Sequence, residues 1–502
     1  MRSKRFGIAL AAAQMVALAA TAGFAATGGA FAKDSLTMGV GLEPPHLDPT
    51  AGAAAAIDEI VYANLFEGLT RIDRNGAVQP GLAESWTISD DRLTYTFTLR
   101  DGVTFHDGAS FDSSDVKFSL DRARAETSTN AQKGLFEGIA SVEAPDPKTV
   151  IVTLKQPEGN FLWNMGWGDA VMVDPASAES NNTNPVGTGP FKLARWTKGD
   201  SVMLTRRDDY WGKAPALKSV TFKFIPDASA QVAALLAGDV DAMPNMGAPE
   251  TLAQFEADPR FEVVVGTTEG ETLLVLNQRR DLFKDPKVRR AIAHAIDKQA
   301  IVDGAMFGFG TPIGSHFAPH NPAYLDLTGV APYDPEKAKS LLAEAGHADG
   351  LKLVMKLPPP SYARRGGEII AAQLRAVGIE TELVNVEWGQ WLSDVFKGDH
   401  DFDLTIVSHT EPLDIGIYAR PDYYFGYHSD AFNAVMDEIR DTADEAKRTK
   451  LYQKAQTILA EDTANVFLFQ LAKTGVRAAK LDGLWENAPI QANDVTGVHW
   501  RK

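Results

Sequence analysis

The stretch from residue 80 to residue 122 restricts the fold more than any other part of the chain. Between Leu93 and Leu99, bulky side chains alternate with threonines, which predicts a strand with one buried and one exposed face. Two Asp-Gly turn dipeptides follow, and then a helix for which Ser113 or Ser114 is the expected N-cap. A strand and a helix joined by tight turns favour a mixed α/β domain. The stretch contains no catalytic motif.

The same mixture of short strands and helices continues along the chain. The most clearly bounded helix begins after Asp285, the expected cap, with Pro286 in its first turn and apolar residues at helical spacing. Further strands are expected at 150–154, 202–205, 220–225, 262–265, 273–277, 351–357, 379–384, 402–407 and 466–471. No repeat or low-complexity linker interrupts them, so any lobes are expected to be joined by short crossovers.

The first 32 residues have the pattern of a secretory signal peptide. Arg2, Lys4 and Arg5 precede an uncharged, alanine-rich run, and Ala30-Phe31-Ala32 is a small-x-small cleavage site. A membrane anchor is the competing interpretation because the run is long enough to span a bilayer, but it is only weakly hydrophobic. Cleavage would leave about 470 residues. That length predicts at least two lobes, because it exceeds the usual size of a single core.

Charge and composition exclude several classes of protein. The formal net charge is −17, and it becomes −20 when the three positive residues of the leader are removed. Such an acidic protein is not expected to bind nucleic acid or an anionic membrane surface, because both require clustered Lys and Arg. The chain has no cysteine, which rules out disulfides, thiolate metal sites and a lipidated cysteine. We therefore expect a freely soluble periplasmic protein and not a lipoprotein.

Motifs for catalysis and for metal binding are weak. Ser114 and Lys117 have the S-x-x-K spacing of penicillin-recognising serine enzymes, but the companion S-D-N and K-T-G motifs are missing. His316 and His320 are four residues apart like a metal-binding pair, but Pro319 between them argues against the helix that such a pair requires. We expect no catalytic residue, no metal and no cofactor.

A set of short segments carries a family resemblance. The segments are Asn64–Leu69 (NLFEGL), Val186–Phe191 (VGTGPF), Asp209–Trp211 (DYW), Leu236–Asp241 (LAGDVD), the helix 285–297, Tyr333–Ala338 (YDPEKA) and Leu341–Gly346 (LLAEAG). With residues 80–122, this ordered set resembles the family 5 solute-binding proteins of ABC importers, a group that includes dipeptide-, oligopeptide-, nickel- and opine-binding proteins. Gly187 and Gly189 are expected to adopt backbone angles that other residues resist. The segments specify a fold and not a substrate.

The resemblance implies a fold and a division into lobes. The implied fold is the α/β, two-lobe periplasmic binding protein fold of type II, in the large cluster with an extra subdomain in the first lobe. Lobe 1 would comprise residues 33–273 and 475–502, with the extra subdomain at about 76–188, and lobe 2 would comprise residues 274–474. The ligand would lie in the cleft between the lobes and be enclosed by a hinge motion.

The resemblance also points to ligand-binding residues in the second lobe. In dipeptide-binding members, an Ala-Arg-Arg segment supplies an arginine that grips the ligand's carboxylate. Arg364 and Arg365 occupy such a segment here, and only one of two adjacent helical arginines can face the cleft. The alternative is that both are exposed. The Glu-Trp-Gly segment that contains Trp388 also recurs in the family.

An acidic loop follows the strand expected at 402–407. The family usually has Gly-Trp and an aspartate-containing loop that binds the ligand's amino group. This chain departs from that pattern, because it has His409, Glu411 and Asp414 in the loop. Either acid could hold a cation, and a solvated loop is the other interpretation.

Four further residues are expected near the ligand on weaker grounds. Tyr424 belongs to a cluster of aromatic residues that suits a cationic or apolar ligand group, although core packing explains it equally well. In the first lobe, His46, Trp163 and Asn245 are expected to line the cleft because of their positions, with core packing as the alternative.

Taken together, these features predict the periplasmic solute-binding component of an ABC importer and not an enzyme. It would act as a monomer, capture a short peptide or an opine-like ligand, and deliver it to an inner-membrane permease with ATPase subunits. A sugar, an amine or a nickel complex is an alternative ligand, and a sensory ligand-binding module is an alternative role. A secreted hydrolase is the remote alternative, since it would need a nucleophile and base or a metal.

Overall fold

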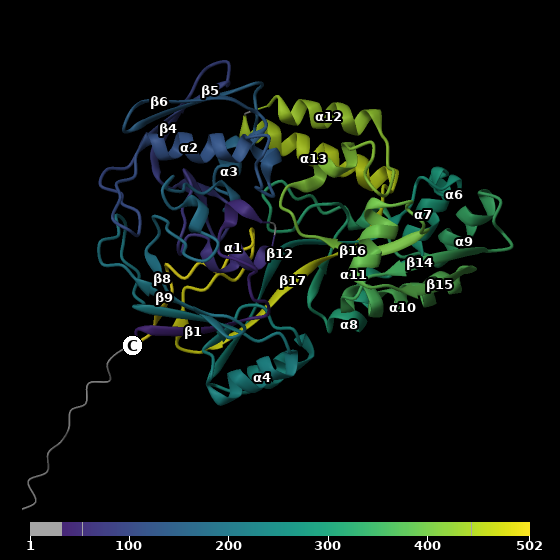
Figure 1. Ribbon diagram of the computed structural model, residues 1–502. Helices are drawn as coiled ribbons and strands as arrows, with labels where there is room; N and C mark the ends of the chain where they lie inside the picture. The colour runs from purple at the N-terminus through teal and green to yellow at the C-terminus, as the bar shows by residue number, and fades with distance from the viewer. Residues whose placement is uncertain (1–32, 53, 443) are drawn as a thin grey trace, which may run out of the picture. The chain divides into compact units, whose positions relative to one another are not determined.

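Most of the strands join one mixed sheet (Figure 1). The structure is a computed structural model that describes residues 33–52, 54–442 and 444–502, so the predicted signal peptide lies outside the described residues. Within these residues the sheet has eleven strands, in the order β15 (Ile379–Asn385), β14 (Leu351–Leu357), β16 (Leu404–His409), β12 (Phe261–Leu276), β17 (Val466–Ala478), β11 (Ala242–Met243), β1 (Ser35–Val40), β10 (Ser219–Phe224), β9 (Ser201–Arg206) and β8 (Phe191–Thr197), with β13 (Gly310–Pro312) beside β17.

The helices lie between and around these strands. They are α1 (Ala55–Val61), α2 (Ser113–Arg124), α3 (Phe161–Asn164), α4 (Ala228–Ala237), α5 (Leu252–Glu256), α6 (Asp281–Lys284), α7 (Pro286–His294), α8 (Lys298–Met306), α9 (Pro335–Glu344), α10 (Ser361–Ala376), α11 (Trp388–Trp391), α12 (Asp430–Arg440) and α13 (Glu445–Asp462). Among the described helices, none is long and apolar enough to cross a membrane. Parallel and antiparallel strand pairs both occur in the sheet, and the predicted mixed α/β content is confirmed.

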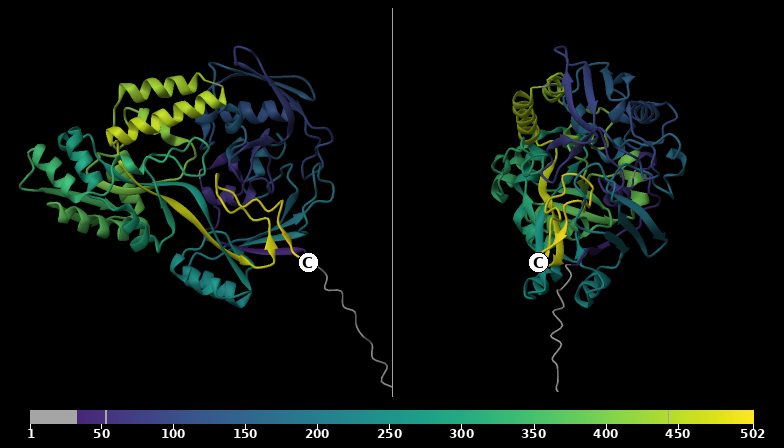
Figure 2. Two further views of the ribbon diagram at one scale, coloured as in Figure 1. Left: turned by 180° about the vertical axis from the view of Figure 1, so that it is seen from behind. Right: turned by 90° about the vertical axis from the view of Figure 1, so that its left-hand side faces the viewer.

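Two long strands, β12 and β17, connect two parts of the sheet. They pair antiparallel along most of their length, with β14, β15 and β16 on one side and β1 and β8 to β11 on the other. Figures 1 and 2 show them side by side between these parts. The predicted lobe boundaries at 273 and 474 fall inside β12 and β17, and residues 34–502 form one compact unit. The division into lobes therefore stays a prediction.

The sequence predicted two strands, at 262–265 and 273–277, where the structure has the single strand β12. Polar residues separate the two apolar runs in the sequence, so the pattern indicated two strands. They remain in the strand, and the pairing with β17 absorbs them through a shift of register between Thr267 and Glu271.

The predicted strand after residue 92 is β5 (Thr94–Leu99), which lies in a separate four-stranded sheet. Its order is β4 (Ala83–Ile88), β5, β7 (Thr149–Leu154) and β6 (Ile139–Asp146). Tyr95, Phe97 and Leu99 are buried, whereas the threonines between them are partly or fully exposed. The bulky face packs into a core that includes α2 and α3. The alternation therefore predicted the correct buried face. Two small hairpin sheets complete the strands, β2 (Thr70–Ile72) with β3 (Val78–Pro80) and β18 (Leu481–Asp482) with β19 (His499–Trp500).

The predicted cap of α2 is wrong by one or two residues. Asp112 is the N-cap, and its carboxylate accepts from the Ser114 backbone N–H at 2.7 Å. The Asp115 carboxylate accepts in return from the Asp112 N–H, which completes a capping box. Because aspartate and serine are about equally favoured as N-caps, these two reciprocal contacts place the cap at Asp112.

The predicted cap of α7 is confirmed. Asp285 accepts from the Lys287 N–H at 2.8 Å, with Pro286 in the first turn. The helix ends at His294 and not at residue 297, because Asp297 is already the N-cap of α8.

Gly187 and Gly189 are needed for a different reason from the predicted one. In the described structure neither has a positive φ. Instead, a Cβ on Gly189 would lie 2.6 Å from the Asn64 carbonyl oxygen, and a Cβ on Gly187 would overlap the Leu65 carbonyl oxygen. The two family segments VGTGPF and NLFEGL are thus in backbone contact, which only glycine allows at these two positions.

Candidate ligand-binding site

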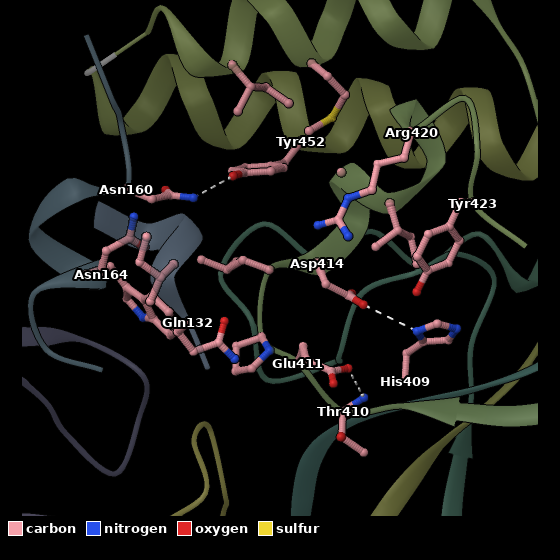
Figure 3. Close-up of a pocket in the computed structure, with 18 of the residues that line it drawn as sticks. Gln132, Asn160, Asn164, His409, Thr410, Glu411, Asp414, Arg420, Tyr423 and Tyr452 are labelled. Carbon is pink, nitrogen blue, oxygen red and sulfur yellow. Dashed lines mark hydrogen bonds and ion pairs between the residues drawn. The ribbon is translucent and has the colours of Figure 1, made fainter. Parts of the chain in front are cut away.

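A cavity of about 780 Å³ is lined by two sets of residues that are far apart in the sequence. One set comes from the segment 132–164, which includes α3, and the other comes from residues 388–452. The second set comprises α11, the end of β16 and the loop after it, and the facing sides of α12 and α13. We call this cavity the ligand pocket. Figure 3 shows side chains from both sets directed into it.

Five of the ten predicted site residues line the ligand pocket: Trp163, Trp388, His409, Glu411 and Asp414. His409 is the last residue of β16, and Asp414 begins the short helical turn Asp414–Ala419. The loop after β16 therefore places Glu411 and Asp414 at the pocket, and their contact with a ligand stays a prediction.

Arg364 and Arg365 do not line the ligand pocket. The Arg364 guanidinium donates to the Val386 carbonyl at 3.2 Å and to the Glu387 carboxylate at 3.1 Å. Helix α10 places this side chain against the segment after β15, where Glu387 neutralises it. Arg365 lies 5.2 Å from the centre of the Phe307 ring.

Tyr424, His46 and Asn245 also lie outside the lining of the ligand pocket. Tyr424 is fully buried behind the pocket wall, and its hydroxyl is 3.2 Å from His409 Nε2. His46 is half-buried, and its Nδ1 accepts from the Asp48 N–H at 3.3 Å. Asn245 is exposed on a bend after β11.

Asp414 lies between two imidazoles. His316 Nε2 is 2.6 Å from one of its carboxylate oxygens, and His409 Nδ1 is 3.5 Å from the other. Burial by itself raises the pKa of Asp414, but the charges and hydrogen bonds of His316 and His409 outweigh it, and the pKa lies well below its usual value. The lowered pKa favours the ionised form of Asp414, with both of its oxygens in contact with imidazoles.

His316 and His320 do not face one another. His316 pairs with Asp414, whereas His320 Nε2 is 2.6 Å from the Glu269 carboxylate, and its Nδ1 is 2.7 Å from the Thr267 hydroxyl. The segment that holds both histidines consists of bends and a turn, as Pro319 predicted. Because His316 and Asp414 are 98 positions apart, no local spacing could have indicated their contact.

Three arginines that the sequence analysis missed line the ligand pocket: Arg420, Arg440 and Arg448. Arg440 is paired with Asp437 at 2.9 Å. Arg420 lies 5.8 Å from the centre of the Tyr423 ring, and it forms no ion pair with any described residue. Figure 3 shows the Arg420 guanidinium directed into the pocket, with Asp414 nearby and its carboxylate directed toward His409. The only sequence signal for Arg420 was its place in the tyrosine-rich segment after Asp414.

Among the residues of the first lining set, Glu158 is a half-buried acid. Its carboxylate accepts from the Asn164 side-chain amide at 2.6 Å. Burial is the main cause that raises its pKa to about 7, and the Asn164 hydrogen bond only partly opposes it. Glu158 therefore changes its charge near neutral pH.

Aromatic rings supply the apolar part of the pocket. Trp163 packs on Trp167 with ring centres 5.0 Å apart, and Trp388 packs edge-on against Trp391 at 5.6 Å. Trp388 is nevertheless 41% exposed, as is Leu392 beside it. A cavity with both signs of charge and exposed aromatic faces suits a small polar ligand with an apolar side group.

Comparison with known proteins identifies the family. A family model described as bacterial extracellular solute-binding proteins, family 5 middle, matches residues 77–431. The chain belongs to this family. Among the family 5 relatives, the glutathione-binding protein GsiB of Escherichia coli (strain K12) is 30% identical over 478 residues, which cover 91% of this chain and 93% of GsiB.

Two solved family 5 structures show the fold. The PBP AgaA of A. tumefaciens R10, in complex with agropinic acid, superimposes with a TM-score of 0.76 and 27% identity, over 93% of this chain and 99% of AgaA. The periplasmic binding protein DppA of Helicobacter pylori, in complex with the peptide STSA, gives a TM-score of 0.77 and 28% identity, over 94% and 99%. The predicted two-lobe fold and the predicted role in solute binding for ABC import are confirmed.

Proposed function

We propose that the ligand pocket binds a zwitterion, either a short peptide or an opine-like amino-acid derivative, for uptake by an ABC importer. The observation that carries the proposal is that Arg420, which forms no ion pair with a described residue, shares the cavity with the ionised Asp414. A ligand carboxylate would pair with the guanidinium, and a ligand ammonium would pair with the aspartate. The ligands of the three relatives support this class: glutathione for GsiB, agropinic acid for AgaA and the peptide STSA for DppA.

The dimensions of the pocket also suit such a ligand. Its volume of about 780 Å³ lies within the range of roughly 300–1,000 Å³ that is typical of small-molecule sites. Trp163 and Trp388 would contact the ligand's apolar side group from opposite sets of lining residues. His409 and Glu411, which also line the pocket, would contact the ammonium end together with Asp414.

In this proposal Arg420 takes the role that the resemblance gave to Arg364 or Arg365. The reason is that Arg364 is already paired with Glu387, while Arg420 points into the pocket (Figure 3). Tyr424 would act from behind the wall through His409. His46 and Asn245 stay predictions without a structural contact to the pocket.

We also propose where the protein works and which proteins it works with. The mature chain would begin at Lys33 and work in the periplasm without a lipid anchor, since the chain has no cysteine. It would act as a monomer, with lobes at 33–273 plus 475–502 and at 274–474. Its partners would be an inner-membrane permease and the ATPase subunits of that permease. No chemical step is proposed for the bound ligand.

A thermal-shift panel on residues 33–502 tests the proposal, with dipeptides, longer peptides, glutathione, opines, sugars and polyamines. A ligand at about 100 times its dissociation constant stabilises the folded state by roughly 2.7 kcal/mol. We expect the unfolding temperature to rise with zwitterionic ligands and not with sugars or polyamines. A shift with sugars alone would overturn the ligand class but would leave the family assignment intact.

A further inference from the structure

Three possible metal ligands meet at one edge of the ligand pocket. His316 comes from the segment after β13, His409 is the last residue of β16, and Asp414 begins the next helical turn. The nearest nitrogen of each imidazole and a carboxylate oxygen of Asp414 all lie within 4.8 Å of one another. We call these three residues the His-His-Asp cluster.

The spacing is close to that of a metal site. Around a tetrahedral zinc ion with bonds of about 2.0–2.1 Å, neighbouring ligand atoms are about 3.3 Å apart. In the cluster, Asp414 is 2.6 Å from His316 Nε2 and 3.5 Å from His409 Nδ1. These two distances are to different oxygens of the carboxylate, and all three ligand atoms lie within 4.8 Å of one another. Side-chain shifts of up to about 1.5 Å would bring them to the spacing of a tetrahedral site.

Each imidazole is also held from its far side. His409 Nε2 lies 3.2 Å from the Tyr424 hydroxyl, and His316 Nδ1 lies 3.4 Å from the Tyr418 hydroxyl. The Asn465 amide in turn donates to the Tyr418 hydroxyl at 3.2 Å. A hydrogen-bond partner on the second ring nitrogen fixes the orientation of a metal-binding histidine, so both rings are arranged as such ligands require.

A fourth side chain with an unpartnered polar atom, Glu271, lies beside the cluster. Glu271 on β12 lies directly opposite His409 on β16, so the two side chains share one face of the sheet. Glu271 is 3% exposed, and its Oε2 has no hydrogen-bond partner among the described residues. The nearby His320 cannot compensate it, because His320 is paired with Glu269. A metal ion bound in the cluster would give this buried oxygen a partner on the same face of the sheet.

We propose that His316, His409 and Asp414 bind one divalent transition-metal ion, of the zinc, nickel or copper class. Two imidazoles and one carboxylate favour these ions over magnesium and calcium, which prefer oxygen ligands alone. His409 and Asp414 line the ligand pocket, so the remaining coordination positions of the metal face the cavity. An amine or a carboxylate of the captured solute can occupy them. The metal site itself does not depend on the identity of that solute.

Metal titration of untagged protein, residues 33–502, tests this site. The protein is stripped with EDTA, dialysed, and titrated with Zn²⁺ in a calorimeter without any organic ligand. We expect one ion per chain, and a loss of affinity of more than about 100-fold in His316→Gln, because even residues that only support a metal ligand change affinity by about 10–100-fold. Co²⁺ serves as a spectroscopic probe, and its visible absorption is expected in the wild type and not in His316→Gln.

The matched control is His428→Gln. His428 also pairs with an aspartate, Asp430, at 3.2 Å, but this pair is exposed and lies outside the cluster. Asp414→Asn, which keeps the shape of the side chain, is the second test variant, and thermal unfolding of the metal-free variants verifies that they fold. Equal Zn²⁺ binding by wild type, His316→Gln and Asp414→Asn would overturn the proposal, as would the absence of a one-to-one complex. Either result would leave the importer assignment unchanged, because that assignment is tested by organic ligands.

Discussion

The Asn160 side-chain amide donates a 3.1 Å hydrogen bond to the hydroxyl of Tyr452, which lies 292 positions away in the sequence. Both residues line the ligand pocket, and each belongs to a different one of its two lining segments (Figure 3). Tyr452 extends from α13, and Asn160 directly precedes α3. The two sets of residues that a ligand would contact are thus already joined by one direct bond.

Removing this bond should weaken ligand binding. Tyr452→Phe deletes the acceptor and keeps the ring, so we expect a loss of about 0.5–1.5 kcal/mol, or roughly 2- to 12-fold in affinity. The physical reason is that the two lining segments lose the direct side-chain bond that positions them before the ligand binds. Calorimetric titration with the best ligand of the thermal-shift panel measures the change. Tyr333→Phe is the control because Tyr333 is 50% exposed and outside the pocket, and an equal loss in both variants would contradict the prediction.

Replacing Arg420 should separate the two candidate anchors for a ligand carboxylate. Hydrogen bonds to charged groups contribute about 1.5–3 kcal/mol, so Arg420→Ala is expected to lower the affinity for a zwitterionic ligand by roughly 10- to 150-fold. The affinity of Arg420→Lys should lie between those of the wild type and Arg420→Ala, because lysine keeps the charge and loses the planar fork. Arg364→Ala should change the affinity by less than about 3-fold, because Arg364 is paired with Glu387 outside the pocket. The reverse ranking would restore the assignment that the sequence suggested.

Glu158 should make the stability of the protein fall as the pH rises. Its pKa in the folded state is raised by burial from 4.5 to about 7, so between these values the folded state holds more protons than the unfolded state. The stabilising contribution is complete below about pH 4.5 and is lost as the pH passes through 7. For this residue the loss amounts to at most roughly 3 kcal/mol.

Urea unfolding at pH 5 and pH 8 measures this contribution. Glu158→Gln cannot titrate, so its free energy of unfolding should decrease less between the two pH values than that of the wild type. Glu256→Gln is the control, because Glu256 is an exposed glutamate. Identical decreases in Glu158→Gln and the wild type would show that Glu158 does not hold its proton in the folded state.

Local structure was largely predictable from the sequence. The alternation in β5 and the cap at Asp285 depend on neighbouring residues alone, and both predictions are confirmed. The cap at Asp112 was missed because aspartate and two serines compete within three positions, and only the contacts with Ser114 and Asp115 decide between them. The continuity of β12 was missed because pairing with β17, not composition, keeps its polar residues extended.

The sequence suggested site residues only where the family resemblance supplied a place for them. Glu411 and Asp414 stand where the family has its ligand-binding loop, and both line the pocket, while their role in binding stays a prediction. Arg420 was missed because nothing nearby in the sequence distinguishes it from a surface arginine. The contact of His316 with Asp414 depends on how distant segments pack, which the spacing of residues along one segment does not encode.

Gly187→Ala should destabilise the protein strongly. A Cβ at this position would overlap the Leu65 carbonyl oxygen and lie 2.8 Å from Phe66 Cδ1, and the backbone oxygen has no freedom to move aside. We expect a loss of at least about 1–3 kcal/mol, which is typical of overpacking in a rigid interior. Thermal unfolding measures it, with Gly134→Ala as the control because a Cβ there meets no atom within 4 Å. If both variants unfold at the same temperature, the close contact between the VGTGPF and NLFEGL segments is not required, and these glycines would need another explanation.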